Sequence, residues 1–269
     1  MTAVTTSTRM PADPPAAPAE PILAAVLDHA HARFFVVAGS QVREIECLTS
    51  PRMRGGKFHS DRQGSPGWGE RGFHGRRHEE ERRHYAAVAR RLGGLVRAHG
   101  AEGVVIGGSR RVVAEFREAL SPTLARAVLG VALLNVTAVS VDAVRRAVRA
   151  ARDTAELAEQ RAWVAALTEG FGKGRAVEGI RPVLQALDRN QVRVLLVAQD
   201  QARVGYRGAR TGRLILSKDE AAGEASVRVP NLIAAVVEEA RRRRAPVIEV
   251  RERRLAARFD GIAALLRYR

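Results

Sequence analysis

Short apolar runs that alternate with helical patterns constrain the fold of this chain more than any other feature. In GVVIGGSRRVVAEFREAL, at residues 103–120, an apolar strand pattern ends at paired glycines and a helical spacing of apolar residues follows. Ser121-Pro122 stops that helix, and a second strand-like run, VLGVALLNV, occupies 128–136. A strand, a helix and another strand in succession predict an α/β layer.

Two β-rich runs precede this layer and predict a hairpin. RFFVVA begins at Arg33 and VREIECL ends at Leu48, and the residues 38–41 between them have the length of a short turn. Cys47 lies in the second predicted strand, where we expect its thiol to pack in the core.

A long loop and a helix follow the hairpin. Residues 52–75 are rich in glycine and other turn residues and predict a loop. From Arg76 onward we predict a helix, because apolar residues recur at three- and four-residue steps. These residues are Tyr85, Val88, Leu92 and Val96.

A second, longer helix is predicted over residues 141–165, where Ala and Val keep the same spacing. Its alanine seam buries little area per residue, so we expect it to pack within its own domain and the protein to be a monomer. The four glycines of 169–179 interrupt the periodicity and indicate a domain boundary.

The remainder of the chain repeats the strand and helix alternation and predicts a second α/β domain. We predict helices at 177–188 and 231–244, strands at 192–198, 214–217 and 246–250, and an extended segment at 202–206. The fold class is therefore α/β with two small domains. We expect a disordered tail at 1–21, a central domain at 22–170 and a C-terminal three-layer domain at 171–269.

The chain is strongly basic, which favours a polyanionic partner. Its 45 Lys and Arg against 29 Asp and Glu give a formal charge of +16 and a pI near 11.4. We see no membrane-spanning run and no secretion signal, so we expect a cytoplasmic location and no membrane partner. A single cysteine excludes an internal disulfide, and an aromatic content of 4% gives little support to a base-stacking platform.

Two features of the predicted loop are candidates for contact with nucleic acid. Arg54-Gly55-Gly56-Lys57, called the tip segment below, places paired glycines between cations, which suits a backbone that approaches phosphates closely. The alternative for these four residues is an ordinary surface turn. Trp68 is the second candidate, because its ring can stack on an exposed base or fold back onto the loop.

An arginine stripe follows on the predicted helix. Four arginines recur every seven residues, which places them on one helix face. They are Arg76, Arg83, Arg90 and Arg97. We expect them to bind RNA phosphates, and the alternative is a solvated face paired with Glu79, Glu80 and Glu81.

Histidines and acids in the same stretch raise the question of a metal. His74 and His78 are four residues apart, which suits metal ligands on a helix, but a third ligand is not evident, so we expect no metal and no cofactor. Asp61, Glu70 and Glu79 are interpreted as salt-bridge partners rather than as the carboxylates of a nuclease.

Three segments together resemble the archaeo-eukaryotic class-1 peptide chain release factor family, whose bacterial and other relatives include Balon and Pelota. The tip segment and the basic helix RRHEEERRHYAAVARRL resemble the GGQ loop of the family and the helix behind it. GVVIGGSRRVVAEF is similar to the unit that supports this loop, and FDGIAALLRYR resembles the closing segment of the family. The resemblance covers the central and C-terminal domains and not the N-terminal domain that reads stop codons.

The resemblance implies a ribosome-binding translation factor that acts at the A site and the peptidyl-transferase centre in rescue, hibernation or quality control. The implied partners are rRNA, peptidyl-tRNA and a translational GTPase such as elongation factor Tu. Where the family has Gln after the paired glycines this chain has Lys57, which has no acceptor with which to position water. A codon-independent peptidyl-tRNA hydrolase that retains main-chain oxyanion stabilisation is the alternative, and a basic RNA-binding module unrelated to ribosomes is a third.

Overall fold

The computed structural model describes residues 20–50, 68–221 and 223–268, and the side chains of its first helix from residue 77 onward. The chain forms two compact units, Met1–Ala155 and Glu156–Arg269. The division lies inside helix α4, Val141–Gly172, whereas the sequence pattern placed it in the glycine-rich run at the end of this helix. In the described part of the chain, no helix combines the length and the apolar content that crossing a membrane requires.

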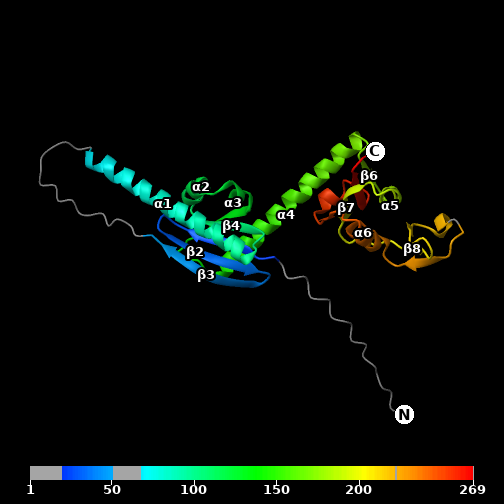
Figure 1. Cartoon of the computed structure of the whole chain (residues 1–269), viewed down its shortest axis with the longest axis horizontal. Coiled ribbons are helices and arrows are strands. Elements are labelled where there is room, and N and C mark those ends of the chain that lie inside the picture. The colour runs from blue at the N-terminus through cyan, green and yellow to red at the C-terminus, as the bar shows by residue number, and fades with distance from the viewer. Residues whose placement is uncertain (1–19, 51–67, 222, 269) are drawn as a thin grey trace, which may run out of the picture. The chain divides into compact units, whose positions relative to one another are not determined.

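The first unit contains a five-stranded mixed sheet in the order β3-β2-β1-β4-β5 (Figure 1). The strands are β1 (Ile22–Leu27), β2 (His31–Ala38), β3 (Gln41–Thr49), β4 (Gly103–Gly108) and β5 (Val128–Leu133). β1, β4 and β5 run parallel, while β2 and β3 are antiparallel to their neighbours. The predicted hairpin is confirmed, with Ala38 opposite Gln41 and Gly39 at a positive φ of 57° in the turn.

Strand β1 is the centre of this sheet, and the sequence patterns did not reveal it. ILAAVL shows no alternation of polar and apolar residues because both of its faces are buried. Successive side chains point to opposite faces. Leu23 and Leu27 therefore pack with helices α1 and α2, while Ile22 and Val26 pack with α4.

Helix α1 spans Trp68–His99 and covers one face of the sheet (Figure 1). Its apolar stripe is as predicted, since Tyr85, Val88 and Leu92 are buried and Val96 packs beside them. The predicted start at Arg76 is wrong, because the helix begins at Trp68 despite the glycines of this stretch. Once a helix is anchored by packing, it propagates through weak helix formers at a cost of about 1 kcal/mol per glycine.

Two shorter helices, α2 (Arg110–Glu118) and α3 (Pro122–Arg126), also belong to this unit. The Ser109 hydroxyl caps α2 by accepting from the backbone N–H of Val112 at 3.3 Å. Cys47 lies on the edge strand β3 and is exposed, so its predicted core position is wrong. An edge strand is covered less completely than a central one.

The second unit is a three-layer α/β structure, as the sequence predicted. Its helices and strands are β6 (Ala176–Glu178), α5 (Ile180–Asp188), β7 (Val192–Ala198), β8 (Gly205–Gly208), β9 (Leu214–Ile215), η1 (Lys218–Ala221), β10 (Ser226–Val229), α6 (Leu232–Arg242), β11 (Val247–Val250), α7 (Arg253–Ala256) and β12 (Ile262–Leu266). The main sheet has the order β11-β7-β12-β6, and β10-β8-β9 form a small second sheet.

The main sheet of this unit buries both faces. Leu195 and Val197 pack with α5 and α6, while Val194 and Leu196 pack with the last turns of α4. The glycine-rich run participates in this packing rather than forming a free linker. A Cβ atom at Gly170 would lie 2.9 Å from the Cβ of Ala176, so the glycine allows α4 to approach β6 closely.

Candidate functional site

The tip segment lies in residues 51–67, outside the described residues, so its contacts remain a prediction. The chain enters this stretch after Ser50, which follows β3, and continues beyond it at the first residue of α1. Trp68 is that first residue, and Arg76 lies in the same helix; neither side chain is among those described.

The described members of the arginine stripe project from α1 into solvent. Arg83, Arg90 and Arg97 are all exposed, while the buried face of the same helix packs on the sheet. Arg83 donates to Glu79 at 3.2 Å, and an exposed ion pair of this kind contributes little to folding stability. Within the described residues, neither Arg90 nor Arg97 has an ion-pair partner. The stripe is therefore available to an anionic partner.

The three consecutive glutamates on α1 do not share one role. Glu79 pairs with the stripe, as the alternative interpretation expected. Glu81 instead points inward, and its side chain is only 9% exposed. It contacts Arg77 at 3.3 Å and His78 at 3.5 Å. The sequence signal for this burial is the position of Glu81 four residues before Tyr85, which places it on the same helix face as the apolar stripe.

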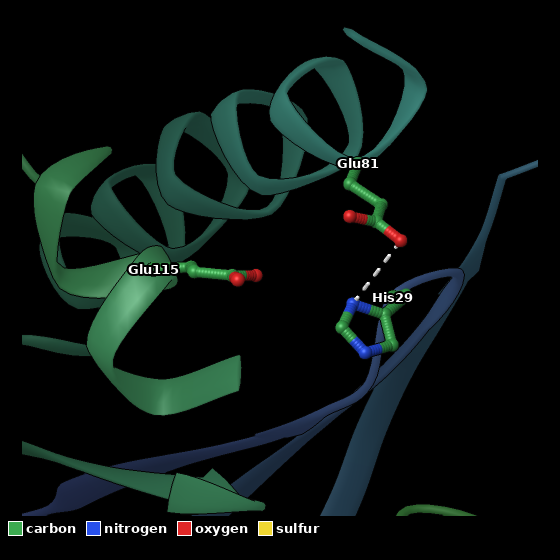
Figure 2. A group of neighbouring side chains, drawn as sticks. All are labelled: His29, Glu81 and Glu115. Atoms are coloured by element: carbon green, nitrogen blue, oxygen red, sulfur yellow. Dashed lines mark ion pairs between the residues drawn. The ribbon is translucent and has the colours of Figure 1, made fainter. Parts of the chain in front are cut away.

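Glu81 belongs to a polar cluster formed by His29, Glu81, Tyr85 and Glu115. Figure 2 shows three of its members, His29, Glu81 and Glu115. His29 comes from the turn between β1 and β2, Glu81 and Tyr85 from α1, and Glu115 from α2. The turn follows the carboxyl end of β1, and α2 begins just after the carboxyl end of β4. These two strands are parallel neighbours, so the fold brings the groups together where the carboxyl ends of both strands lie.

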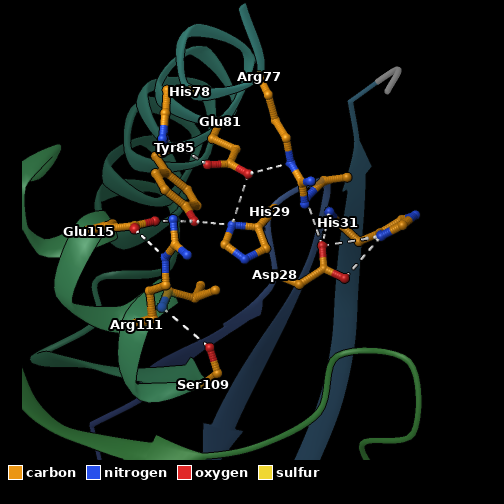
Figure 3. Close-up of polar contacts among 12 residues, drawn as sticks. Asp28, His29, His31, Arg77, His78, Glu81, Tyr85, Ser109, Arg111 and Glu115 are labelled. Atoms are coloured by element: carbon orange, nitrogen blue, oxygen red, sulfur yellow. Dashed lines mark hydrogen bonds and ion pairs between the residues drawn. The ribbon is translucent and has the colours of Figure 1, made fainter. Parts of the chain in front are cut away.

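Hydrogen bonds connect the members of the polar cluster (Figure 3). The Tyr85 hydroxyl donates to a Glu115 oxygen at 3.2 Å and lies 2.9 Å from Nδ1 of His29. The same nitrogen is 3.6 Å from the Glu81 carboxylate. The turn that carries His29 is fixed by Asp28, whose carboxylate accepts from the backbone N–H groups of Ala30 and His31 at 2.7 Å each.

The environment shifts the pKa values of several of these groups. Burial raises the pKa of Tyr85, and the nearby negative charge of Glu115 adds to this effect, so the phenol stays protonated. The hydrogen bond from Arg111 lowers the pKa of Glu115. Burial opposes ionisation of Asp28, but the two backbone hydrogen bonds outweigh it and lower the pKa of that carboxyl.

His84 forms a separate contact between α1 and the residue that precedes the undescribed stretch. Its side chain is buried, and Nδ1 lies 2.7 Å from the hydroxyl of Ser50. Burial lowers the pKa of His84, so the neutral ring is favoured at neutral pH. Its other nitrogen, Nε2, is buried without a hydrogen-bond partner among the described residues.

The remaining sequence candidates take ordinary positions. His78 is exposed and contacts Glu81, whereas the side chains of His74 and Glu70, and all of Asp61, lie outside the described part. The spacing of His74 and His78, which suits metal ligands on a helix, did not predict the polar cluster, because neither histidine is a member of it. The sequence signal that could have located His29 is the apolar run ILAAVL, which forms a central strand. A residue just after such a strand lies where the carboxyl ends of parallel strands meet.

Comparison with known proteins identifies the family. Residues 16–156 match the model of bacterial archaeo-eukaryotic release factor family 10. No curated protein sequence matches the chain.

Solved structures share the fold. Archaeal Pelota, from a model of ribosome-bound Pelota and ABCE1, aligns at 18% identity and a TM-score of 0.54 over 92% of this chain and 61% of its own. Dom34 of S. cerevisiae, a translation termination-like factor that interacts with Hbs1, aligns at 8% identity and a TM-score of 0.53, covering 92% and 63%. Pelota of Archaeoglobus fulgidus aligns at 19% identity and a TM-score of 0.45, covering 93% and 65%.

The chain thus spans less than two thirds of the length of these proteins. The resemblance inferred from the tip segment, the supporting unit and the closing segment is confirmed, and so is the α/β fold class. The family model covers the sheet, the helices α1 to α3, the first part of α4 and the polar cluster, all of which lie in the first unit. The chain belongs to bacterial archaeo-eukaryotic release factor family 10.

Proposed function

We propose that this chain is a ribosome-binding translation factor that carries its tip segment toward the peptidyl-transferase centre from the A site. Its role would lie in ribosome rescue, hibernation or quality control, in the cytoplasm. Family membership supports the proposal, as does the fold shared with a Pelota described as ribosome-bound. The formal charge of +16 supports a polyanionic partner.

The arginine stripe is the observation that carries the proposal. Arg83, Arg90 and Arg97 are exposed and recur every seven residues of one helix. At 1.5 Å per residue this spacing places successive guanidinium groups about 10 Å apart along the helix. A rigid row of cations on the helix that follows the tip segment in the sequence suits repeated phosphate contacts along folded RNA. Ribosomal RNA is the partner of this kind that the family membership favours.

A translational GTPase is the second proposed partner. Dom34, which shares the fold, is described as interacting with Hbs1. In this chain the second unit offers exposed arginines at the end of α6, Arg241 and Arg244. Arg242 and Arg243 are engaged with Glu239 at 2.8 and 2.7 Å, so this helix end is partly paired rather than wholly solvated.

Cosedimentation with purified ribosomes over a series of salt concentrations tests the proposal. Replacing Arg83 and Arg90 with Ala should weaken binding and reduce the salt slope by about one unit for each phosphate that is no longer neutralised. The matched control replaces Arg146 and Arg149, two exposed arginines of α4, with Ala, which changes the net charge equally. Equal slopes for the two double variants would contradict a specific role for the stripe.

The same preparation separates binding from hydrolysis. We expect the protein to bind ribosomes that carry labelled peptidyl-tRNA without releasing the peptide, because Lys57 has no acceptor with which to position water. Release above background that disappears when residues 55–57 are deleted would favour the hydrolase instead.

A further inference from the structure

We propose that His29, Glu81 and Glu115 form a binding site for a divalent metal ion of the Zn²⁺ and Mn²⁺ class. Each residue offers one ligand atom, and these three atoms all lie within 4.8 Å of one another. They come from the β1–β2 turn, from α1 and from α2 and converge toward a common point (Figure 2). The juxtaposition therefore results from the tertiary fold and not from a local sequence pattern.

The charge balance of the polar cluster favours a cation. Glu81 is nine-tenths buried, and desolvation of a carboxylate is costly unless a cation compensates it. Its partners Arg77 and His78 have side chains that are each 62% exposed, so solvent screens the charges that they offer to Glu81. Glu115 brings a second negative charge, and its partner Arg111 is 64% exposed. A divalent ion between the two carboxylates would neutralise the charge of both.

The donor set identifies the class of metal. One imidazole nitrogen with two carboxylate oxygens suits Zn²⁺ or Mn²⁺, whereas Ca²⁺ prefers oxygen ligands alone. Bonds of about 2.0–2.2 Å place ligand atoms at most about 4.4 Å apart, so small rotations of the glutamate side chains close the site.

The surroundings resemble the support that metal ligands have in proteins. The Tyr85 hydroxyl donates to Glu115 and is placed to orient that ligand (Figure 3). It also lies 2.9 Å from Nδ1 of His29, a contact that metal binding at this nitrogen would replace. Glu81, Tyr85 and Glu115 also line an open groove between α1 and α2. Three protein ligands leave a coordination position for water that this groove can supply. Bound metal would cross-link α1, α2 and the β1–β2 turn.

Direct metal titration tests the proposal. The full chain carrying Cys47→Ser, which removes the exposed cysteine as a competing ligand, is freed of metal with a chelator and titrated with Zn²⁺, Mn²⁺ and Mg²⁺ in a calorimeter. We expect one site that prefers Zn²⁺ or Mn²⁺ to Mg²⁺, and a higher melting temperature when it is filled. Absence of binding at millimolar metal overturns the proposal.

Variants and spectroscopy locate the site. Glu81→Gln and Glu115→Gln should each weaken binding at least about tenfold. Glu79→Gln, two residues from Glu81 and exposed, is the matched control and should bind as tightly as the parent. Equal weakening by the control, or loss of binding in His78→Asn while Glu115→Gln is unaffected, would overturn the assignment.

X-ray absorption spectroscopy of the zinc-loaded parent protein identifies the ligand atoms of the bound ion and does not require a variant that folds. One imidazole nitrogen with oxygen ligands is the expected shell. Several imidazoles or sulfur would contradict the site. These outcomes do not depend on ribosome binding, so the metal site and the proposed function fail or succeed separately.

Discussion

The hydrogen bond between Ser50 and His84 should contribute measurably to stability, because it joins both sides of the segment that holds the proposed tip. The two side chains are 2.7 Å apart, and His84 is 1% exposed. Replacing His84 with Ala removes a hydrogen bond with a net value of about 1 kcal/mol. It also leaves a cavity in a close-packed region. Together these losses should lower the free energy of unfolding by about 2–4 kcal/mol.

A double-mutant cycle separates the bond from the cavity. Ser50→Ala alone should cost about 1 kcal/mol. The double variant should be more stable than the sum of the single effects predicts, by about 0.5–1.5 kcal/mol. Urea unfolding followed by circular dichroism measures all four proteins, and the slope m should stay constant. Strict additivity of the two substitutions would refute the bond.

The pH dependence of this hydrogen bond has a definite sign. Burial lowers the pKa of His84 in the folded state, so the unfolded chain binds the proton more tightly. The stabilising contribution of His84 is therefore fully present above the ordinary histidine pKa of about 6.5. It is lost as pH falls through the lowered pKa of the folded state. The stability difference between the parent and His84→Ala should shrink in acid. A difference that grows in acid would show that the ring is charged in the fold.

Three further predictions concern the packing and pairing of the first unit. Leu92→Ala, at a position with 0% exposure, should destabilise the protein by about 2–5 kcal/mol in urea unfolding. Gly108→Ala should cost about 1–3 kcal/mol, because the new methyl group would meet the backbone oxygen of Leu27 at 2.9 Å. The hydrogen bond from Arg91 lowers the pKa of Glu46, so this pair should stabilise the fold above the ordinary Glu pKa of about 4.3 and lose its effect as pH falls through the lowered value. Comparison of the parent with Glu46→Gln at neutral and acid pH measures that loss, and a stability difference independent of pH would contradict it.

Local patterns in the sequence were sufficient for much of the fold. The run GVVIGG became β4, and the spacing of Tyr85, Val88 and Leu92 marked the buried face of α1. The helical spacing records the one-sided burial of α1, whereas GVVIGG is an apolar run buried on both faces and ended by paired glycines. Strand β1 is also buried on both faces and shows no alternation, but ILAAVL lacks the paired glycines that mark the end of β4, and it was missed.

The polar cluster was beyond the reach of sequence patterns for a physical reason. His29, Glu81 and Glu115 are far apart in the chain, and only the parallel pairing of β1 with β4 brings the turn and α2 together. The arginine stripe, in contrast, follows from helix periodicity alone, so its exposed members could be predicted. Its role in binding RNA stays a prediction until it is measured.

A cryo-EM map of this chain bound to the ribosome tests the central claim most directly. We predict density for Arg54, Gly55, Gly56 and Lys57 at the peptidyl-transferase centre. We also predict that Arg83, Arg90 and Arg97 lie within hydrogen-bonding distance of rRNA phosphates. A bound chain with α1 turned toward solvent and the tip segment packed against its own protein would contradict both expectations.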